Sequence, residues 1–427
     1  MLKRTLSYTI MALLNIAVVS AQTAPSSALF GELPSFAGTE EIHRDNAFDI
    51  GVRVSNNFDD NALNDNRNKH PNLLTTVEPR FSWTGLHPRT EWALDYSPGY
   101  SVSHRLPVYS SQSHHLDATF HWRPAKRLRV QFHNSFLESA NPFDRLRAGE
   151  PTVGSTGVDQ PNSSFTAQAR MRNEQAGLDF IYATSPHGII GAKSSFFNVN
   201  YSEIKGSQLL GRAASVTEQL FYSHHLTQRQ WVGGEYSLQD LNTHNPRSWA
   251  MVHSLFYTHS ILLGPNMVFS LFGGPQYASV REQSLAGRSV VPVGGQWAGG
   301  ATYTWNWNHN RVAAGFSRRI SDGAGLTGIV RLSSAYTEVR REIAPRWDAD
   351  VLLSYDRNRL LSATPNILGY ISGAAGLRHT LARGVSLEVR YWRVHDWVAG
   401  IGPAATLADH NRVSVALQYD FQSRLSR

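Results

Sequence analysis

The histidines are the residues of this chain most suited to metal chemistry, and the sequence contains 18 of them. Adjacent histidines such as His114 and His115 lie in segments of alternating character, so their rings point to opposite faces and cannot share one ion. His253 and His259 share a face but lie about 20 Å apart along an extended strand. We therefore predict no metal site and no cofactor, and we assign these histidines structural roles.

Serine, histidine and acidic residues are also abundant enough for a hydrolase, but no GxSxG sequence is present. Gly323, Gly325 and Gly328 satisfy the GxGxxG pattern of nucleotide-binding loops. No βαβ unit surrounds this pattern, so we reject nucleotide binding. The sequence predicts that the protein is not an enzyme.

The elements that would position any functional side chain are long strands with strict alternation. Val413, Val415, Leu417, Tyr419 and Phe421 share one face of the segment 412–421, and polar or small residues occupy the other. Similar segments run for ten or more residues, whereas strands of soluble sandwiches average about 5 to 6. Strands of about 9 to 11 residues tilted by about 45° span a bilayer. The sequence thus predicts an all-β, closed antiparallel transmembrane β-barrel.

About eighteen such segments follow one another, and their connections alternate in length. We predict short periplasmic turns and longer extracellular loops, two of which fall at 241–246 and 282–294. The segments around 164–182 and 188–201 alternate poorly, and we interpret Glu174 or Lys193 as a bulge or a misplaced strand. An even number of strands places both termini of the barrel in the periplasm.

The N-terminus indicates export. Lys3 and Arg4 precede the mostly apolar stretch 8–19, and small residues end at Ala21, which is typical of a cleaved signal peptide over 1–21. We predict a periplasmic N-terminal arm over 22–46, the barrel over 47–421 and a short tail over 422–427. The chain has no cysteine, which excludes a disulfide framework. The predicted location is the bacterial outer membrane.

Three early segments carry a resemblance to a known family. They are FDIGVRVSNNFDDNALND (48–65), LLTTVEPRFSW (73–83) and LDYSPGYSVSH (94–104). Over residues 47–137 the chain resembles the beta-barrel porin 2 family, which implies an outer-membrane channel; some relatives look like components of polysaccharide export. Tyr419 and Phe421 resemble the C-terminal aromatic assembly signal read by the barrel-assembly machinery. The chain departs from that pattern because six residues follow Phe421.

If the apolar faces meet lipid, the opposite faces line a lumen wide enough for water. The predicted pore-lining residues form a basic group and a mainly acidic group: Arg123, Arg127, Arg129, His133, Arg170 and Arg172, then Asp348, Asp350, Asp356, Arg378, Glu388 and Arg390. Two interpretations remain open. The opposed charges select polar solutes through a transverse field, or they merely solvate an aqueous lumen.

Arginine outnumbers lysine 35 to 5. Guanidinium groups suit carboxylate, phosphate or sugar-acid recognition, although genomic base composition also explains such a ratio. A pI near 9.6 in an exported barrel favours contact with lipopolysaccharide phosphates and anionic solutes, and we predict no nucleic acid partner.

The longest connection, 139–163, is the third outer loop. Its position favours folding into the pore, as in general porins, and a solvent-exposed loop is the alternative. We predict a porin-like channel for passive diffusion of small polar or charged solutes. The alternative is a conduit for exopolysaccharide export that works with periplasmic partners.

Overall fold

The structure is a computed structural model. It describes residues 47–424 except 64, 67, 108–109, 145–168, 203–210, 245–246, 285–286, 324–327, 362–366 and 400–408. The predicted signal peptide, the N-terminal arm and residues 425–427 lie outside the described residues. No helix among the described residues is long and apolar enough to cross a membrane.

The described residues form eighteen strands. Their bounds are β1 (Ala47–Asp59), β2 (Asn72–Leu86), β3 (Thr90–Ser103), β4 (Ser111–Ala125), β5 (Leu128–Ser139), β6 (Arg170–Ser185), β7 (Gly188–Ser202), β8 (Ala213–Thr227), β9 (Gln230–His244), β10 (Arg247–Gly264), β11 (Met267–Ser284), β12 (Gly287–Trp307), β13 (Asn310–Ser321), β14 (Val330–Ala344), β15 (Trp347–Leu360), β16 (Ile367–Ala382), β17 (Val385–Ala399) and β18 (Asp409–Arg424).

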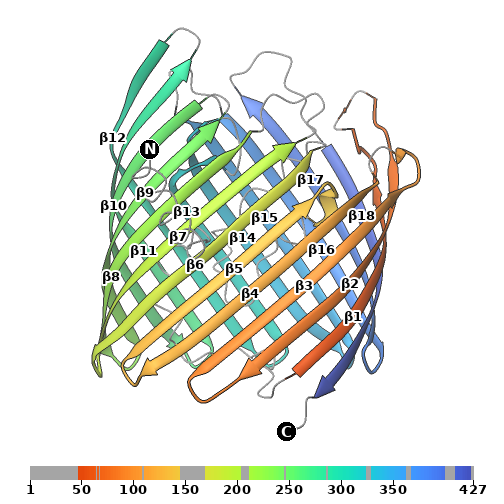
Figure 1. The fold of residues 1–427 in the computed structure, drawn as a ribbon, viewed down its shortest axis with the longest axis horizontal. Helices are drawn as coiled ribbons and strands as arrows, with labels where there is room; N and C mark the ends of the chain where they lie inside the picture. The colour runs from red at the N-terminus through yellow and green to blue at the C-terminus, as the bar shows by residue number, and fades with distance from the viewer. Residues whose placement is uncertain are drawn as a thin grey trace, which may run out of the picture.

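These strands make one closed antiparallel barrel (Figure 1). Each strand pairs with its neighbours in sequence, and β1 also pairs with β18, which closes the sheet. Closure pairs every strand on both sides over the body of the barrel, and this is what allows strands to exist in lipid. The predicted fold, including eighteen strands, is confirmed. Ala47 lies opposite Arg424, so both ends of the barrel chain are at the same end.

The two ends of the barrel differ. Short turns join the strands at one end, here called the turn end, and longer connections emerge at the other, the loop end (Figure 1). The turns are tight: Gly384, between β16 and β17, has a φ of 75°. A Cβ there would lie 2.3 Å from the Asp420 carbonyl oxygen, so the turn requires glycine.

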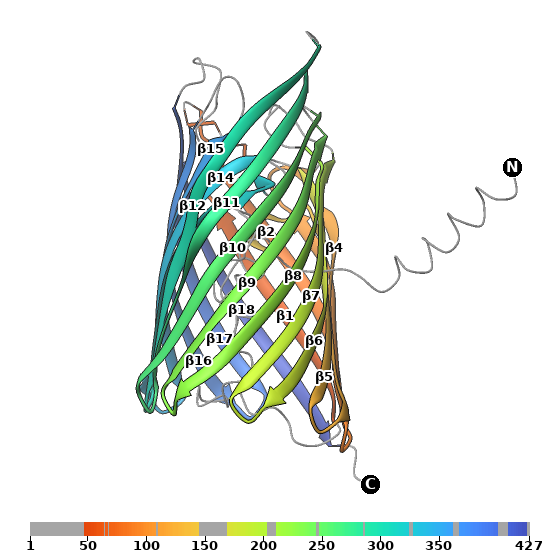
Figure 2. The ribbon, with the colours of Figure 1, turned by 90° about the vertical axis from the view of Figure 1, so that its left-hand side faces the viewer.

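The predicted loops at 241–246 and 282–294 are mostly strand instead. β9 extends to His244, and β11 and β12 form a tall hairpin that rises beyond the rest of the barrel (Figure 2). Pairing between β12 and β13 begins only at Gly299, so residues 287–298 pair with β11 alone. Over this stretch β12 is an edge strand, which tolerates Pro292, and the hairpin has a register shift near Ser279. A proline and an irregular register interrupt the alternation from which strands are predicted.

The outer face carries exposed apolar side chains. On β18, Val415 and Leu417 are 42% and 49% exposed, whereas Ser414 and Ala416 between them are 4% and 1% exposed. Aromatic pairs occur on this face toward both ends, with Trp83 and Trp92 near the turn end. An apolar band between aromatic residues is the surface that a membrane-spanning barrel presents to lipid.

No register shift occurs at Glu174 or Lys193, so the prediction of a bulge there is wrong. The shifts recorded for β6 and β7 lie beside the turn, between Ala183 and Ser185. Lys193 points inward and its ammonium lies 3.3 Å from the carboxylate of Asp179 on the neighbouring strand. A buried cation with a carboxylate partner explains the irregular hydrophobic pattern without a bulge.

Candidate solute pathway

On β2 the inner wall is more accessible at the turn end than at the loop end. On β2 the inward side chains Asn72, Leu74 and Thr76 are at most 3% exposed. Four residues nearer the turns, on the same inner face, the Arg80 side chain is 52% exposed. Along β2, therefore, the inner wall is accessible near the turns and buried near the loops.

Charged side chains form a continuous network across the inner wall from β2 to β15. Arg53 donates to Glu388 at 2.9 Å and lies 3.9 Å from Glu78. Arg390 donates to Asp350 at 2.6 Å and lies 3.6 Å from Glu388. All five side chains are partly buried, with 10% to 24% exposure, so these pairs are less screened by water than surface pairs are.

Small residues on the intervening strands make this network sterically feasible. Gly376 of β16 lies between Asp350 and Arg390 in the register. A Cβ at this position would meet the Asp350 carboxylate at 2.5 Å and Arg390 Nε at 2.9 Å. Ala416 of β18 similarly lies opposite Glu388. Because these two residues have small side chains, the charged groups on the strands to either side can contact one another across β16 and β18.

The strand register shows where the predicted pore-lining residues lie. Eight of them are on the inner face: Arg129, His133, Asp348, Asp350, Asp356, Arg378, Glu388 and Arg390. Asp350, Glu388 and Arg390 are brought together in the network described above. Arg378 lies opposite both Asp348 and Glu388 in the register.

The predicted inward placement of Arg170 and Arg172 is wrong. On β6, Met171 and Ile181 are 2% and 5% exposed and face inward, so the even-numbered residues face outward. Arg170 pairs with Glu138 at 3.3 Å on that outer face, and the Arg172 guanidinium lies 5.3 Å from the Phe136 ring centroid. The local alternation is inverted, with apolar side chains inside and polar ones outside near the loop end.

Two more predicted residues lie at the turn end instead of along the wall. Arg127 lies in the short turn between β4 and β5 and is exposed. Arg123 is also exposed, and its backbone N–H donates to the Arg89 carbonyl of the neighbouring turn. The prediction that Arg127 lines the pore is therefore wrong, because a turn residue is not part of the lumen wall.

The start of the third loop folds into the barrel. Phe143 is only 2% exposed, and its ring packs edge-on against Trp392 of β17 at 5.9 Å. Asn141 donates to Ser101 on β3 at 3.2 Å and to Asp144 at 3.1 Å. The described part of this loop, residues 140–144, thus takes the inward alternative. Residues 145–163 of the predicted loop lie outside the described residues.

A buried ionic cluster on the neighbouring strand β18 also contacts this segment, since Arg412 lies directly opposite Trp392 in the register. The Arg412 guanidinium lies 5.7 Å from the Phe143 ring centroid, and Arg412 Nε donates to Asp59 at 2.7 Å. His410 contacts the other Asp59 oxygen at 2.9 Å. Donor atoms of Asp59, Asp60 and His410 lie within 4.8 Å of one another, as in metal sites. Arg412 already forms an ion pair with Asp59, however, and Lys69 forms one with Asp60. Cations of the protein itself therefore neutralise these two carboxylates.

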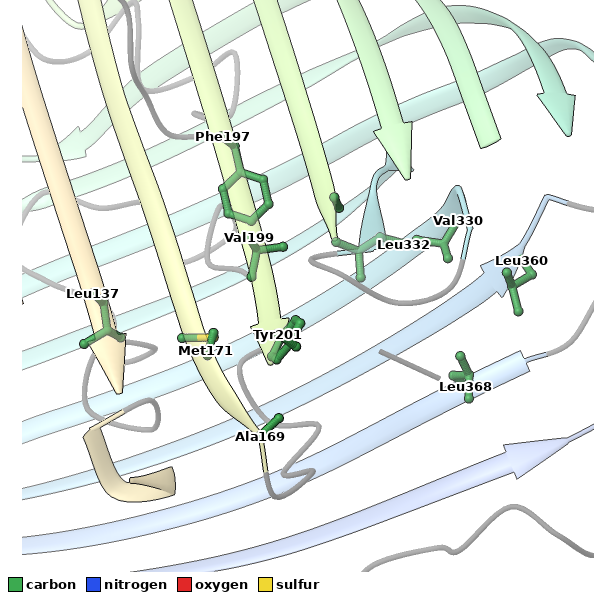
Figure 3. Close-up of a cluster of buried hydrophobic side chains, with 11 residues drawn as sticks. Leu137, Ala169, Met171, Phe197, Val199, Tyr201, Val330, Leu332, Leu360 and Leu368 are labelled. Carbon is green, nitrogen blue, oxygen red and sulfur yellow. The ribbon is translucent and has the colours of Figure 1, made fainter. Parts of the chain in front are cut away.

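Apolar side chains also occupy the loop end of the lumen. One cluster combines residues of β5–β8 with residues of β14–β16, which are on opposite walls of the barrel (Figure 3). It contains Leu137, Ala169, Met171, Phe197, Val199, Tyr201, Ala213, Val330, Leu332, Leu360 and Leu368. An aqueous channel lined entirely by polar residues would not bury such a set, so this level narrows the lumen.

Sequence reasoning missed Arg53, Glu78, Phe143 and Arg412. Arg53 and Glu78 lie on the polar faces of alternating strands, and that alternation was a sufficient signal to include them. Arg412 also lies on the face that alternation assigns to the interior. Phe143 lies in a loop, and no local pattern shows that its partners are Trp392 and Arg412.

Comparisons with known proteins give no family assignment. No protein-family model matches the chain, and no curated protein matches it. The resemblance to the beta-barrel porin 2 family is therefore not confirmed.

Solved structures of similar architecture exist. Pseudomonas aeruginosa OpdQ shares 11% identity, with 88% of this chain and 99% of OpdQ covered and a TM-score of 0.43. Pseudomonas aeruginosa OccK2 (OpdF) in complex with glucuronate shares 8% identity, with 88% and 98% covered and a TM-score of 0.46. Acinetobacter baumannii OccAB4 shares 10% identity, with 89% and 98% covered and a TM-score of 0.45. At these identities and TM-scores, the comparisons say nothing of function.

Proposed function

We propose that the protein is an outer-membrane channel for passive diffusion of small polar or charged solutes. The observation that carries this proposal is the contrast between an outer surface rich in exposed apolar side chains and an inner face with the ionic network Glu78–Arg53–Glu388–Arg390–Asp350. Ionised groups inside a lipid-facing barrel pair with one another or face water, and the partial exposure of this network supports a hydrated interior at its level. The wall charges then bias which solutes pass.

The proposed diffusion is tested by swelling of liposomes that contain the folded protein. We expect uptake of small sugars, amino acids and sugar acids. Arg129→Gln removes an inward positive charge and should slow anionic solutes relative to neutral ones. Arg172→Gln is the matched control, because it removes an outward positive charge from the neighbouring strand. Equal effects of the two substitutions would contradict a role for the inner wall.

The filled loop end favours a second candidate, a conduit for exopolysaccharide export that opens only with periplasmic partners. The inward segment 140–144 and the apolar cluster across the lumen are the observations that favour it. Such a conduit would not conduct small solutes alone. Permeability of liposomes containing the protein without partners therefore distinguishes the two candidates.

A further inference from the structure

Four arginines gather on the outer face of β13–β15 near the loop end. Arg331 of β14 lies directly opposite Arg359 of β15. Two residues nearer the turn end, on the same face, Ser333 of β14 lies opposite both Arg318 of β13 and Arg357 of β15. Phe316 and Tyr355, which precede these positions on the same face, are 50% and 38% exposed. The four guanidinium groups are therefore on one outward patch, here called the arginine patch.

Among the described residues, no acidic side chain neutralises the arginine patch. None of its four members forms an ion pair within the described part of the chain. Arg318 and Arg359 are the charges that act on Arg331, whose Nε is buried without a hydrogen-bond partner. Like charges directly opposite in a sheet destabilise it. An anion from outside the chain would relieve this repulsion.

Other outward arginines near the loop end show the contrast. Arg170 has Glu138 as its partner, and Arg172 has the Phe136 ring. Arg393 on β17 lies 3.6 Å from Asp409. Each of these cations has an acidic or aromatic partner within the protein, although the Nε of Arg170, like that of Arg331, is buried without a hydrogen-bond partner. The arginine patch differs from them, since no described residue is an acidic or aromatic partner of its guanidinium groups.

An apolar groove of about 510 Å³ begins on the turn-end side of the arginine patch. The outward alanines Ala301, Ala314 and Ala335 leave space between larger side chains. Those larger side chains are Phe269, Tyr303, Phe316, Leu353, Tyr355 and Ile371. Arg318 and Arg357 lie two residues, or about 7 Å, beyond Phe316 and Tyr355 along their strands. The guanidinium groups of the arginine patch thus lie at the loop-end side of an apolar groove on the outer surface.

We infer that this surface is a binding site for a phosphorylated, acylated lipid of the outer leaflet. The phosphate lies on the arginine patch and an acyl chain lies in the groove. Guanidinium groups bind phosphate oxygens through paired, charge-assisted hydrogen bonds. The inference rests on the proposed outer-membrane placement, which puts the loop end in the outer leaflet. It adds a specific lipid site to the proposed channel.

The test compares lipid binding by two matched double variants of the full chain in detergent. Arg331→Gln/Arg359→Gln removes the directly opposed pair of the arginine patch. Arg172→Gln/Arg341→Gln removes two outward arginines from other parts of the surface. The probes are bisphosphorylated lipid A, the same lipid without phosphates, and inorganic phosphate. Binding is measured from co-purified lipid and from the shift in the thermal unfolding midpoint.

We expect bisphosphorylated lipid A to raise the unfolding midpoint of the wild type, while the other two probes leave it unchanged. The patch variant should bind this lipid at least about tenfold more weakly, and the matched variant should bind as the wild type does. Ala335→Phe, which fills the groove, should also weaken binding.

Equal binding by the two double variants would overturn the inference, as would an equal response to inorganic phosphate or to the dephosphorylated lipid. Channel conductance distinguishes failure of the proposed lipid site from failure of the proposed channel. Protein that conducts but shows no phosphate-dependent lipid binding contradicts only the lipid site. Folded protein that neither swells liposomes nor conducts contradicts the proposed channel itself.

Discussion

At the residue scale, the inner-wall network depends on missing side-chain bulk as much as on charge. Gly376 occupies the position over which Asp350 and Arg390 meet, and a Cβ there would be 2.5 Å from the carboxylate oxygen. The pair thus requires glycine on the strand between its two members. A charge network of this kind is sensitive to an uncharged substitution.

Gly376→Ala should destabilise the barrel by about 1 to 3 kcal/mol, because the added methyl group displaces a well-packed ion pair. Urea unfolding of the protein in detergent measures this loss. Gly373→Ala is the matched control on the same strand, since its Cβ would face outward and meet only the flexible Leu353 side chain at 3.3 Å. Equal stability of the two variants would show that the network does not depend on the space at Gly376.

Phe143 is the residue through which the third loop narrows the lumen. Phe143→Ala should cost about 3 to 5 kcal/mol of stability if the cavity stays open, and it should raise single-channel conductance. Phe132→Ala, on the outer face of β5, is the control and should leave conductance unchanged. An unchanged conductance in the Phe143 variant would mean that the inward segment does not limit the path.

Asp60, in the loop after β1, gives a pH-dependent prediction. Partial burial opposes ionisation, but hydrogen bonds from Asn411 and the Lys69 ammonium outweigh it and lower the pKa of Asp60 below its ordinary value of 3.8. A lowered folded-state pKa means that ionised Asp60 stabilises the fold above pH 3.8 and that this contribution is lost as pH falls through the folded-state pKa.

The unfolding free energies of the wild type and Asp60→Asn should therefore differ at neutral pH and converge in acid. Unfolding at a series of pH values measures the difference. A gap that persists unchanged well below pH 3.8 would show that it does not come from ionisation of Asp60.

At the scale of the strand, β18 separates lipid-facing from inward residues. Leu417→Arg should cost about 2 to 4 kcal/mol if the residue lies near the middle of the bilayer, and assembly should fail or slow. Ser82→Arg is the control, because Ser82 faces inward between Asp49 and Asp95. Heat-modifiable electrophoretic mobility reports assembly. Normal assembly of the Leu417 variant would reverse the assignment of faces.

The sequence was sufficient to predict the strands because alternation is a local property. β15 shows this clearly: Asp348, Asp350 and Asp356 are inward as the pattern requires. β6 shows the limit, since Arg170 and Arg172 find partners on neighbouring strands and the local polarity is inverted. The position of Phe143 depends on strands distant in sequence. Contacts of that kind leave no local pattern.

At the scale of the whole molecule, the barrel is closed in the sheet but uneven along its axis. On β2 the turn end of the inner wall is accessible and charged, and the loop end of the lumen holds residues 140–144 and the apolar cluster that spans it. Both candidate functions use this asymmetry. A diffusion channel uses it as a size and charge filter, whereas an export conduit uses it as a closed state.

The most direct test is the conductance of the purified, folded protein in a planar bilayer under a salt gradient. The proposed channel predicts stable open steps without any partner, with a reversal potential that shifts toward cations in Arg129→Gln and stays unchanged in Arg172→Gln. A bilayer that stays silent, with protein confirmed as folded by heat-modifiable mobility, would contradict passive diffusion.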